Sequence, residues 1–167
     1  MEKRRRLVAA GLNPSRVTQV AIDFDRDSLA NALEREGFDG RRRSFVIWEG
    51  VTNYLTEDAV DAVLRWASSL ATGSRLAFTY VHARVLEDPA TFEGAERVLA
   101  SVAKAGEAWT YGIDPAGLQD RLAAHGLKFL EDLGANDYRA RYCAPPDAQA
   151  RGYAFYRAAL ASVPGHA

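Results

Sequence analysis

A short apolar segment that runs into an acid and a glycine constrains the fold of this chain more than any other feature. The residues Phe45-Val46-Ile47-Trp48 are all apolar, a pattern typical of a short strand buried in a parallel sheet. Glu49-Gly50 follow directly, and Thr56-Glu57-Asp58 then begins an amphipathic helix. Ligands of open α/β sheets bind just beyond the carboxyl ends of the strands, so Glu49 is a candidate site residue. The alternative is that Glu49 only caps a neighbouring backbone amide.

The rest of the chain alternates between strand and helix patterns, which predicts an α/β fold with a mostly parallel sheet. The expected strands are residues 17–22, 45–48, 75–81 and 127–133, and residues 153–160 fit either a strand or a helix. The expected helices are residues 2–12, 29–37, 57–71, 95–103 and 115–125, where apolar residues recur at helical spacing. The length of 167 residues and the lack of a long linker predict a single domain over residues 1–167.

Composition and charge narrow the classes of function. A net charge of −1 gives no electrostatic reason to expect nucleic acid or an anionic membrane as a partner. The basic clusters at residues 3–6, at residues 41–43 and at Arg139 with Arg141 are therefore expected to be solvated. The single cysteine, Cys143, excludes an internal disulfide and fits a reducing compartment. No apolar segment is long enough to span a membrane, so we expect a cytoplasmic protein.

The acidic segment at residues 23–27 is compatible with two kinds of site. One is a calcium loop, because oxygen-bearing side chains fall at the spacing of EF-hand ligands: Asp23, Asp25, Asp27, Asn31 and Glu34. Two features disfavour it, since Ser28 stands where that loop needs a glycine and a strand is expected before Asp23. We therefore expect no metal site and no stabilisation by calcium. The other kind of site is a nucleotide-type cleft.

Several motifs, in order along the chain, resemble S-adenosylmethionine-dependent methyltransferases related to leucine carboxyl methyltransferase. The most specific is Trp48–Leu55, with the sequence WEGVTNYL, which is similar to a signature of that family. Four further segments resemble family elements: VAIDF at residues 20–24, GSRLAF at 73–78, EDLG at 131–134 and YRARY at 138–142. The resemblance implies a Rossmann-like class I methyltransferase sheet with helices on both faces.

The resemblance also implies a cofactor and a reaction. Asp23 and Phe24 would lie against the adenine of S-adenosyl-L-methionine, and Glu49 would line the same cleft near its positive charges. The methyl group would pass to an oxygen of a small-molecule or carboxylate-bearing acceptor. Positioning alone can drive that transfer, so no catalytic residue is assigned. Further residues near the expected pocket are Tyr54, Tyr80, His82 and Trp109, whereas His125 is better interpreted as a cation at a helix end.

One departure from the family pattern concerns the start of the chain. The family begins with a strand and a glycine-rich turn, but here Gly11 is the only glycine before Gly37. We therefore expect an N-terminally truncated sheet, completed by a missing N-terminal segment or by a homo-oligomer, and weak cofactor binding by the chain alone. The alternative function is a truncated, non-catalytic remnant that acts as a binding or assembly module.

Overall fold

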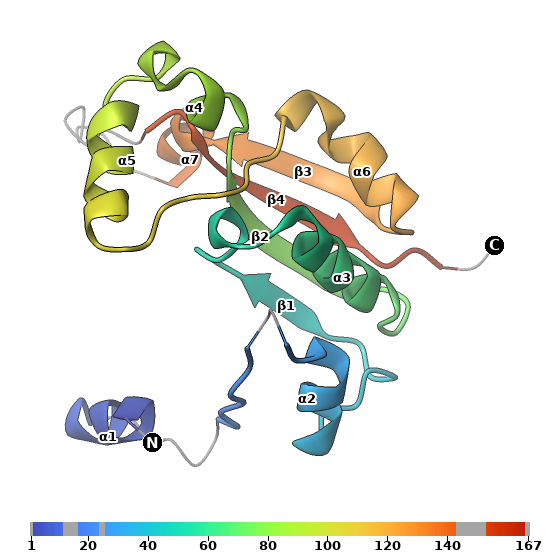
Figure 1. Ribbon diagram of the computed structural model, residues 1–167. Helices are drawn as coiled ribbons and strands as arrows, with labels where there is room; N and C mark the ends of the chain where they lie inside the picture. The colour runs from blue at the N-terminus through green and yellow to red at the C-terminus, as the bar shows by residue number, and fades with distance from the viewer. Residues whose placement is uncertain (1, 12–16, 24–25, 143–152, 166–167) are drawn as a thin grey trace. The chain divides into compact units, whose positions relative to one another are not determined.

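The computed structural model describes residues 2–11, 17–23, 26–142 and 153–165 (Figure 1). They divide into two compact units, Met1–Asp39 and Gly40–Ala167, which are described separately. The expectation of a single domain over residues 1–167 stays a prediction.

The first unit holds two helices, α1 (Glu2–Ala9) and α2 (Leu29–Arg35). Both were predicted, and α2 begins where Ser28 caps it by accepting a hydrogen bond from the Asn31 amide. The predicted strand at residues 17–22 is wrong, because these residues have no strand structure. A strand is stabilised by hydrogen bonds to a neighbouring strand, and the described part of this unit contains none to pair with.

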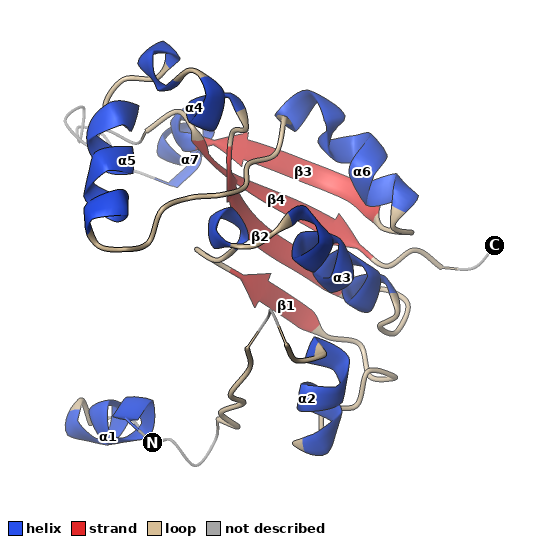
Figure 2. Ribbon diagram, viewed as in Figure 1, coloured by secondary structure: helices blue, strands red, loops and turns tan. Residues whose placement is uncertain are grey.

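The second unit is built on a four-stranded sheet with the order β1-β2-β4-β3 (Figure 2). The strands are β1 (Phe45–Trp48), β2 (Arg75–Val81), β3 (Lys128–Gly134) and β4 (Tyr156–Ser162). β1 and β2 pair in parallel, whereas β4 runs antiparallel to both β2 and β3. The strand alternative for the C-terminal segment is therefore the right one. β1, β2 and β3 run in one direction, as expected for a mostly parallel sheet, whereas the antiparallel β4 between β2 and β3 was not predicted.

Helices surround this sheet and connect its strands. They are α3 (Glu57–Ser68), α4 (Arg84–Glu87), α5 (Ala95–Lys104), α6 (Leu118–Ala124) and α7 (Ala135–Tyr142), with 3-10 turns at Thr52–Tyr54, Pro89–Thr91 and Pro115–Gly117. In Figure 1, α3 and α6 lie in front of the sheet and α7 is drawn behind it. The EDLG segment ends β3, and YRARY forms the end of α7. Within the residues that the structure describes, no helix is long and apolar enough to cross a membrane.

Burial alternates along β1, so its two faces differ sharply. Trp48 is 7% exposed and packs near Phe78 of β2, with a distance of 6.0 Å between the ring centroids. Phe45 and Ile47 point to the other face and are 60% and 70% exposed. Successive side chains of a strand point to opposite faces, so α3 covers one face of β1 while the other is uncovered within this unit. The short apolar segment is thus a strand as predicted, but only half of it is buried.

Candidate functional site

Glu49 follows the last residue of β1, where its side chain is exposed. No described residue forms an ion pair with its carboxylate or donates a hydrogen bond to it, so the structure gives no support to the capping alternative. Gly50 takes a φ of 69°, in the left-handed region that favours glycine, and this conformation turns the chain sharply. The Gly50 amide donates to Thr79 Oγ1 on β2 at 2.8 Å.

The rest of the WEGVTNYL segment is held in place from two sides. On one side, Thr52 Oγ1 donates to the Thr79 carbonyl at 2.8 Å. On the other, the Thr110 amide donates to the Asn53 carbonyl at 2.9 Å, and Thr110 Oγ1 donates to the Leu55 carbonyl at 3.2 Å. Thr52 and Asn53 are consequently buried, at 1% and 6% exposure. The backbone that carries Glu49 is therefore fixed relative to the end of β2.

Aromatic side chains gather at the same edge of the sheet. Tyr156 begins β4 opposite Val81, the last residue of β2, so the antiparallel pairing brings it to the carboxyl edge. Its ring lies 5.6 Å from that of Trp109, and burial together with the nearby Tyr54 and Tyr153 raises its pKa. Tyr54 and Tyr156 are still 39% and 38% exposed. The sequence did not single out Tyr153 and Tyr156, because their place depends on the direction of β4.

The residues predicted to contact adenine precede the second unit in the chain. Asp23 belongs to the first unit, where its amide donates to Asp27 Oδ2 at 2.9 Å and its carboxylate lies 3.7 Å from Arg26 Nε. Phe24 lies outside the described residues, and Glu49 belongs to the second unit. That Asp23, Phe24 and Glu49 share one cleft therefore stays a prediction.

The calcium alternative depends on residues that the structure uses in other ways. Asn31 and Glu34 lie within α2, and Asp27 accepts the hydrogen bond from the Asp23 amide. Asp25 lies outside the described residues. Among the residues that are described, no group of three or more histidine, cysteine, aspartate or glutamate side chains could hold a metal ion.

Tyr80, a candidate for the pocket, belongs instead to a buried polar network. Its hydroxyl donates to Asp132 Oδ1 at 3.0 Å, and Arg157 donates to Asp132 Oδ2 through Nε at 3.0 Å and Nη2 at 2.7 Å. Tyr80 is 1% exposed, and burial followed by the nearby Asp132 carboxylate raises its pKa. The network joins β2, β3 and β4, so its role in this structure is to hold strands together.

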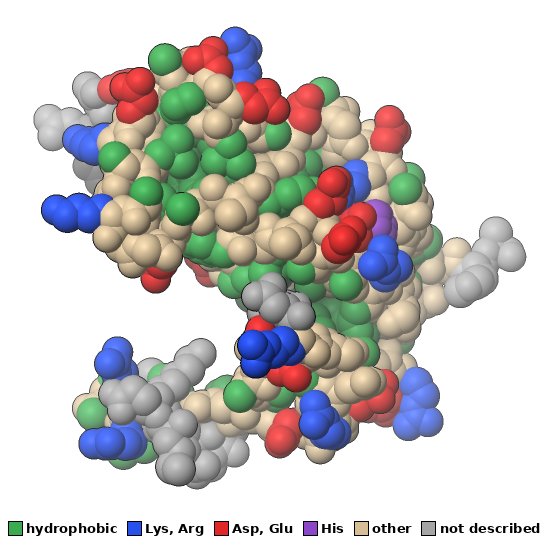
Figure 3. Space-filling view, viewed as in Figure 1, with side chains coloured by type: hydrophobic (Ala, Val, Ile, Leu, Met, Phe, Trp, Pro, Cys, Tyr) green, Lys and Arg blue, Asp and Glu red, His purple; other side chains and the backbone are tan. Residues whose placement is uncertain are grey.

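A second polar cluster lies between α3 and α6, where Figure 3 shows acidic, basic and histidine side chains gathered. Arg121 of α6 forms ion pairs with Glu57 and Asp61 of α3. His125 directly follows the last residue of α6, with Nδ1 2.9 Å from the Arg121 carbonyl oxygen and Nε2 3.3 Å from Asp61 Oδ1. The interpretation of His125 as a helix-end residue agrees with this position.

The other two pocket candidates lie nearer the carboxyl edge. His82 is half-buried, and its ring lies tilted against that of Phe92, with 5.3 Å between the ring centroids. Its Nδ1 accepts a hydrogen bond from the Arg84 amide at 3.2 Å. Trp109 is 9% exposed and packs against Phe155 and Tyr156. Both side chains are therefore used mainly in packing.

Comparison with solved structures supports the fold class. A solved structure from Thermobifida fusca YX, provisionally described as a methyltransferase, matches with a TM-score of 0.65 and 18% sequence identity. The match covers 98% of this chain and 59% of that chain. At 18% identity the similarity is evidence for the fold but not for the function. It confirms the predicted α/β class with a Rossmann-like sheet.

Sequence comparison shows which family the N-terminal part of the chain resembles. Residues 1–68 match the family model of leucine carboxyl methyltransferase. Two relatives, provisionally named S-adenosyl-L-methionine-dependent methyltransferases, are 46% identical over 72 residues in Mycobacterium avium (strain 104) and 48% identical over 63 residues in Mycobacterium marinum (strain ATCC BAA-535 / M). The predicted resemblance to this family is confirmed, and the family match includes Asp23, Phe24 and WEGVTNYL.

The extent of these matches matters for function. They cover 42% and 37% of this chain, but only 24% and 21% of the two relatives. The chain thus spans about a quarter or less of the curated relatives that it matches, and its motifs after residue 68 lie outside the family match. Because the family model and both relatives are methyltransferases by name, the matches favour the enzyme class over a non-catalytic module.

Proposed function

We propose that this chain forms part of an S-adenosyl-L-methionine-dependent methyltransferase that transfers a methyl group to an oxygen atom of its acceptor. One observation carries the proposal: Glu49 presents an exposed carboxylate, without a described partner, at the carboxyl end of β1. Ligands of α/β sheets bind at that edge. The residues that carry Glu49 also belong to the segment that matches the leucine carboxyl methyltransferase family.

The chemistry of Glu49 suits this cofactor. S-adenosylmethionine carries positive charge on its sulfonium and its α-amino group, and it supplies the activated methyl group when bound. A carboxylate near those charges attracts them, most strongly where water is partly excluded. The hydrogen bonds from Gly50 and Thr52 to Thr79 hold the backbone next to Glu49. Preorganisation of this kind lowers the entropy cost of binding.

The remaining roles follow from the type of each side chain. The Asp23 carboxylate would accept a hydrogen bond from the exocyclic amine of adenine, and the Phe24 ring would cover the face of the base. Tyr54 and Tyr156 give the carboxyl edge a half-exposed aromatic surface. Such a surface favours an acceptor that places an apolar body beside its reacting oxygen, which could belong to a carboxylate or a hydroxyl group.

A titration of the purified chain with S-adenosylmethionine, followed by amide shifts in two-dimensional NMR, tests the proposal. We expect saturable shifts at Gly50 and Thr79, with weak affinity, in roughly the millimolar range. Glu49→Gln should weaken binding by about tenfold to a hundredfold, because hydrogen bonds and contacts to a charged group contribute about 1.5–3 kcal/mol.

The matched control is Glu96→Gln, which removes an exposed carboxylate from α5 and should leave the affinity unchanged. Equal affinities for the wild type and Glu49→Gln would overturn the role of Glu49. Shifts confined to residues away from the carboxyl edge would overturn the site as a whole.

A further inference from the structure

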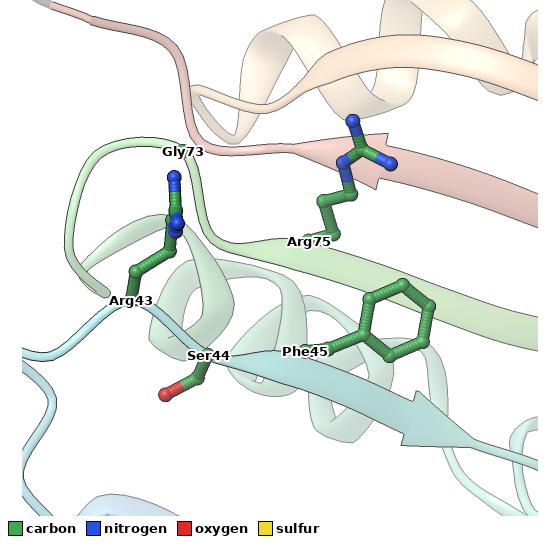
Figure 4. A pocket seen from close by; sticks show the side chains of 5 residues that line it. All are labelled: Arg43, Ser44, Phe45, Gly73 and Arg75. Carbon is green, nitrogen blue, oxygen red and sulfur yellow. The ribbon is translucent and has the colours of Figure 1, made fainter.

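A pocket of about 310 Å³ opens at the end of the sheet opposite to Glu49 (Figure 4). It is lined by Arg43, Ser44, Phe45, Gly73 and Arg75. Phe45 is the first residue of β1, whereas Glu49 follows its last residue, so the strand separates the pocket from the proposed cofactor edge. None of its lining residues belongs to the site described above.

Three of the lining side chains share one face of the sheet. Phe45 and Arg75 are direct neighbours in the parallel register of β1 and β2. In Figure 4 the side chains of Arg43 and Arg75 extend in the same direction, and Ser44 points away. The Ser44 hydroxyl donates to the Arg42 carbonyl at 3.0 Å, so it serves the local backbone. The two guanidinium groups and the phenyl ring are therefore the groups that a ligand would meet.

These two arginines differ from three others of the second unit that are held by acids. Arg121, Arg141 and Arg157 all form ion pairs with carboxylates. Among the described residues, no carboxylate pairs with Arg43 or Arg75, and the pocket lining contains no acid. An Arg43 side chain can lie close to Gly73 because that residue has no Cβ, which would stand 3.3 Å from Arg43 Cδ. The positive charge of the pocket is thus not neutralised by the described part of the chain.

The neighbouring strands extend this positive charge. Arg75 pairs with Ser162 of β4, and Ser162 pairs with Lys128 of β3, so one row of residues crosses the sheet next to the pocket. Lys128 is exposed. At a strand spacing of about 4.8 Å, its Cα lies about 10 Å from that of Arg75. The row contains two cations and no acid, which raises the local potential for an anion.

We propose that this pocket binds a small anion, a carboxylate or phosphate, that is attached to a flat apolar group. The planar N–H forks of Arg43 and Arg75 suit the paired oxygens of such an anion. Phe45, which is 60% exposed, offers its ring to the apolar part. A volume of about 310 Å³ holds a ligand of the size of a substituted benzene.

Titration of the chain with phenyl phosphate, benzoate, inorganic phosphate and phenol, followed by amide shifts of Ser44, Phe45 and Arg75, tests this proposal. Phenyl phosphate or benzoate should bind more tightly than inorganic phosphate and phenol, because only they engage both the arginines and Phe45. The stronger of the two identifies the preferred anion. Their affinity should fall as sodium chloride is raised, since salt screens exposed charges.

Arg43→Gln and Arg75→Gln should each weaken binding of the preferred anion by about tenfold, as expected for one charge-assisted hydrogen-bonding group. Arg42→Gln is the matched control, because Arg42 is exposed and does not line the pocket, and it should leave the affinity unchanged. Thermal unfolding shows whether each variant is folded, and the shifts in the wild type locate the site without any variant. Phenol binding as tightly as both anions, or an Arg43→Gln/Arg75→Gln double variant that binds like the wild type, would refute the proposal.

Discussion

The two faces of the sheet in the second unit differ in how far their phenylalanine side chains are buried and in whether their arginines form ion pairs. On the face under α3 and α6, Phe78 is 2% exposed, and Arg157 is held by Asp132 and Tyr80. On the opposite face, Phe45 is 60% exposed and Arg75 has no carboxylate partner among the described residues. The same two residue types therefore stabilise the fold on one face and remain available to a ligand or partner on the other.

This contrast indicates which arginines and phenylalanines can be changed at little cost. A buried side chain loses its packing when it is truncated, while an exposed one loses contacts mainly with water. The burial pattern of each strand, more than the residue type, thus separates structural positions from candidate binding positions. Three predictions test the contrast.

The largest effect is expected from removing a phenyl ring on the covered face. Phe78→Ala should lower the free energy of unfolding by about 3–5 kcal/mol, because it opens a cavity between β2 and its neighbours. Phe45→Ala, the matched change on the uncovered face, should alter it by only about 0.5 kcal/mol or less. Urea unfolding followed by circular dichroism measures both. Similar losses for the two variants would mean that Phe45 is buried in solution, and the contrast between the faces would fail.

The next effect concerns the ion pair within the covered face. Asp132→Ala leaves the guanidinium of Arg157 half-buried without its carboxylate, and we expect a loss of about 3 kcal/mol in unfolding free energy. Glu131→Ala is the control, since Glu131 pairs with Arg141 while both side chains are substantially exposed. Exposed pairs contribute less than about 1 kcal/mol. If chemical denaturation gave equal losses for the two variants, the network of Tyr80, Asp132 and Arg157 would have no special structural role.

Local patterns were sufficient to predict most elements of the second unit. The apolar run of β1, the cap at Thr56 and the core spacing of α3 each depend on residues close in sequence, and the structure has all three. The direction of β4 could not be predicted in this way, because pairing between distant strands determines it. The strand expected at residues 17–22 failed for a related reason: its apolar pattern is adequate, but a strand also needs a neighbour.

The part of the candidate site that depends on local sequence was predictable, and the part that depends on strand pairing was not. Glu49 was identified because the end of a strand and the start of a helix are both visible around it in the sequence. Tyr156 was missed, since only the antiparallel pairing with β2 brings it to the carboxyl edge. That no described carboxylate pairs with Arg43 or Arg75 could likewise not be predicted, because ion pairs such as that of Arg157 with Asp132 join residues far apart in the chain.

The smallest predicted effect is a loss of stability at high pH, and it involves Tyr111, whose ring centroid lies 5.5 Å from the guanidinium carbon of Arg121 on α6. Burial is the main cause that raises the pKa of Tyr111 to about 12, with Arg121 opposing it and Glu57 and Asp61 adding to it. In the unfolded chain the pKa of a tyrosine is about 10, so the unfolded state releases its proton first as the pH rises. The contribution of Tyr111 is therefore fully present below about pH 10 and is lost between about pH 10 and 12.

Tyr111→Phe removes this titration, so its unfolding free energy should fall less steeply than that of the wild type above pH 10. One such group changes the slope by at most about 1.4 kcal/mol per pH unit, and we expect a difference of about 1 kcal/mol or less near pH 11. Tyr142→Phe is the matched control, because it removes the same hydroxyl from a tyrosine that is 69% exposed. Absorbance at about 295 nm follows tyrosine ionisation directly. If the absorbance change that is lost in Tyr111→Phe were centred near pH 10, which is about the ordinary value for a tyrosine, Tyr111 would not be shielded from water.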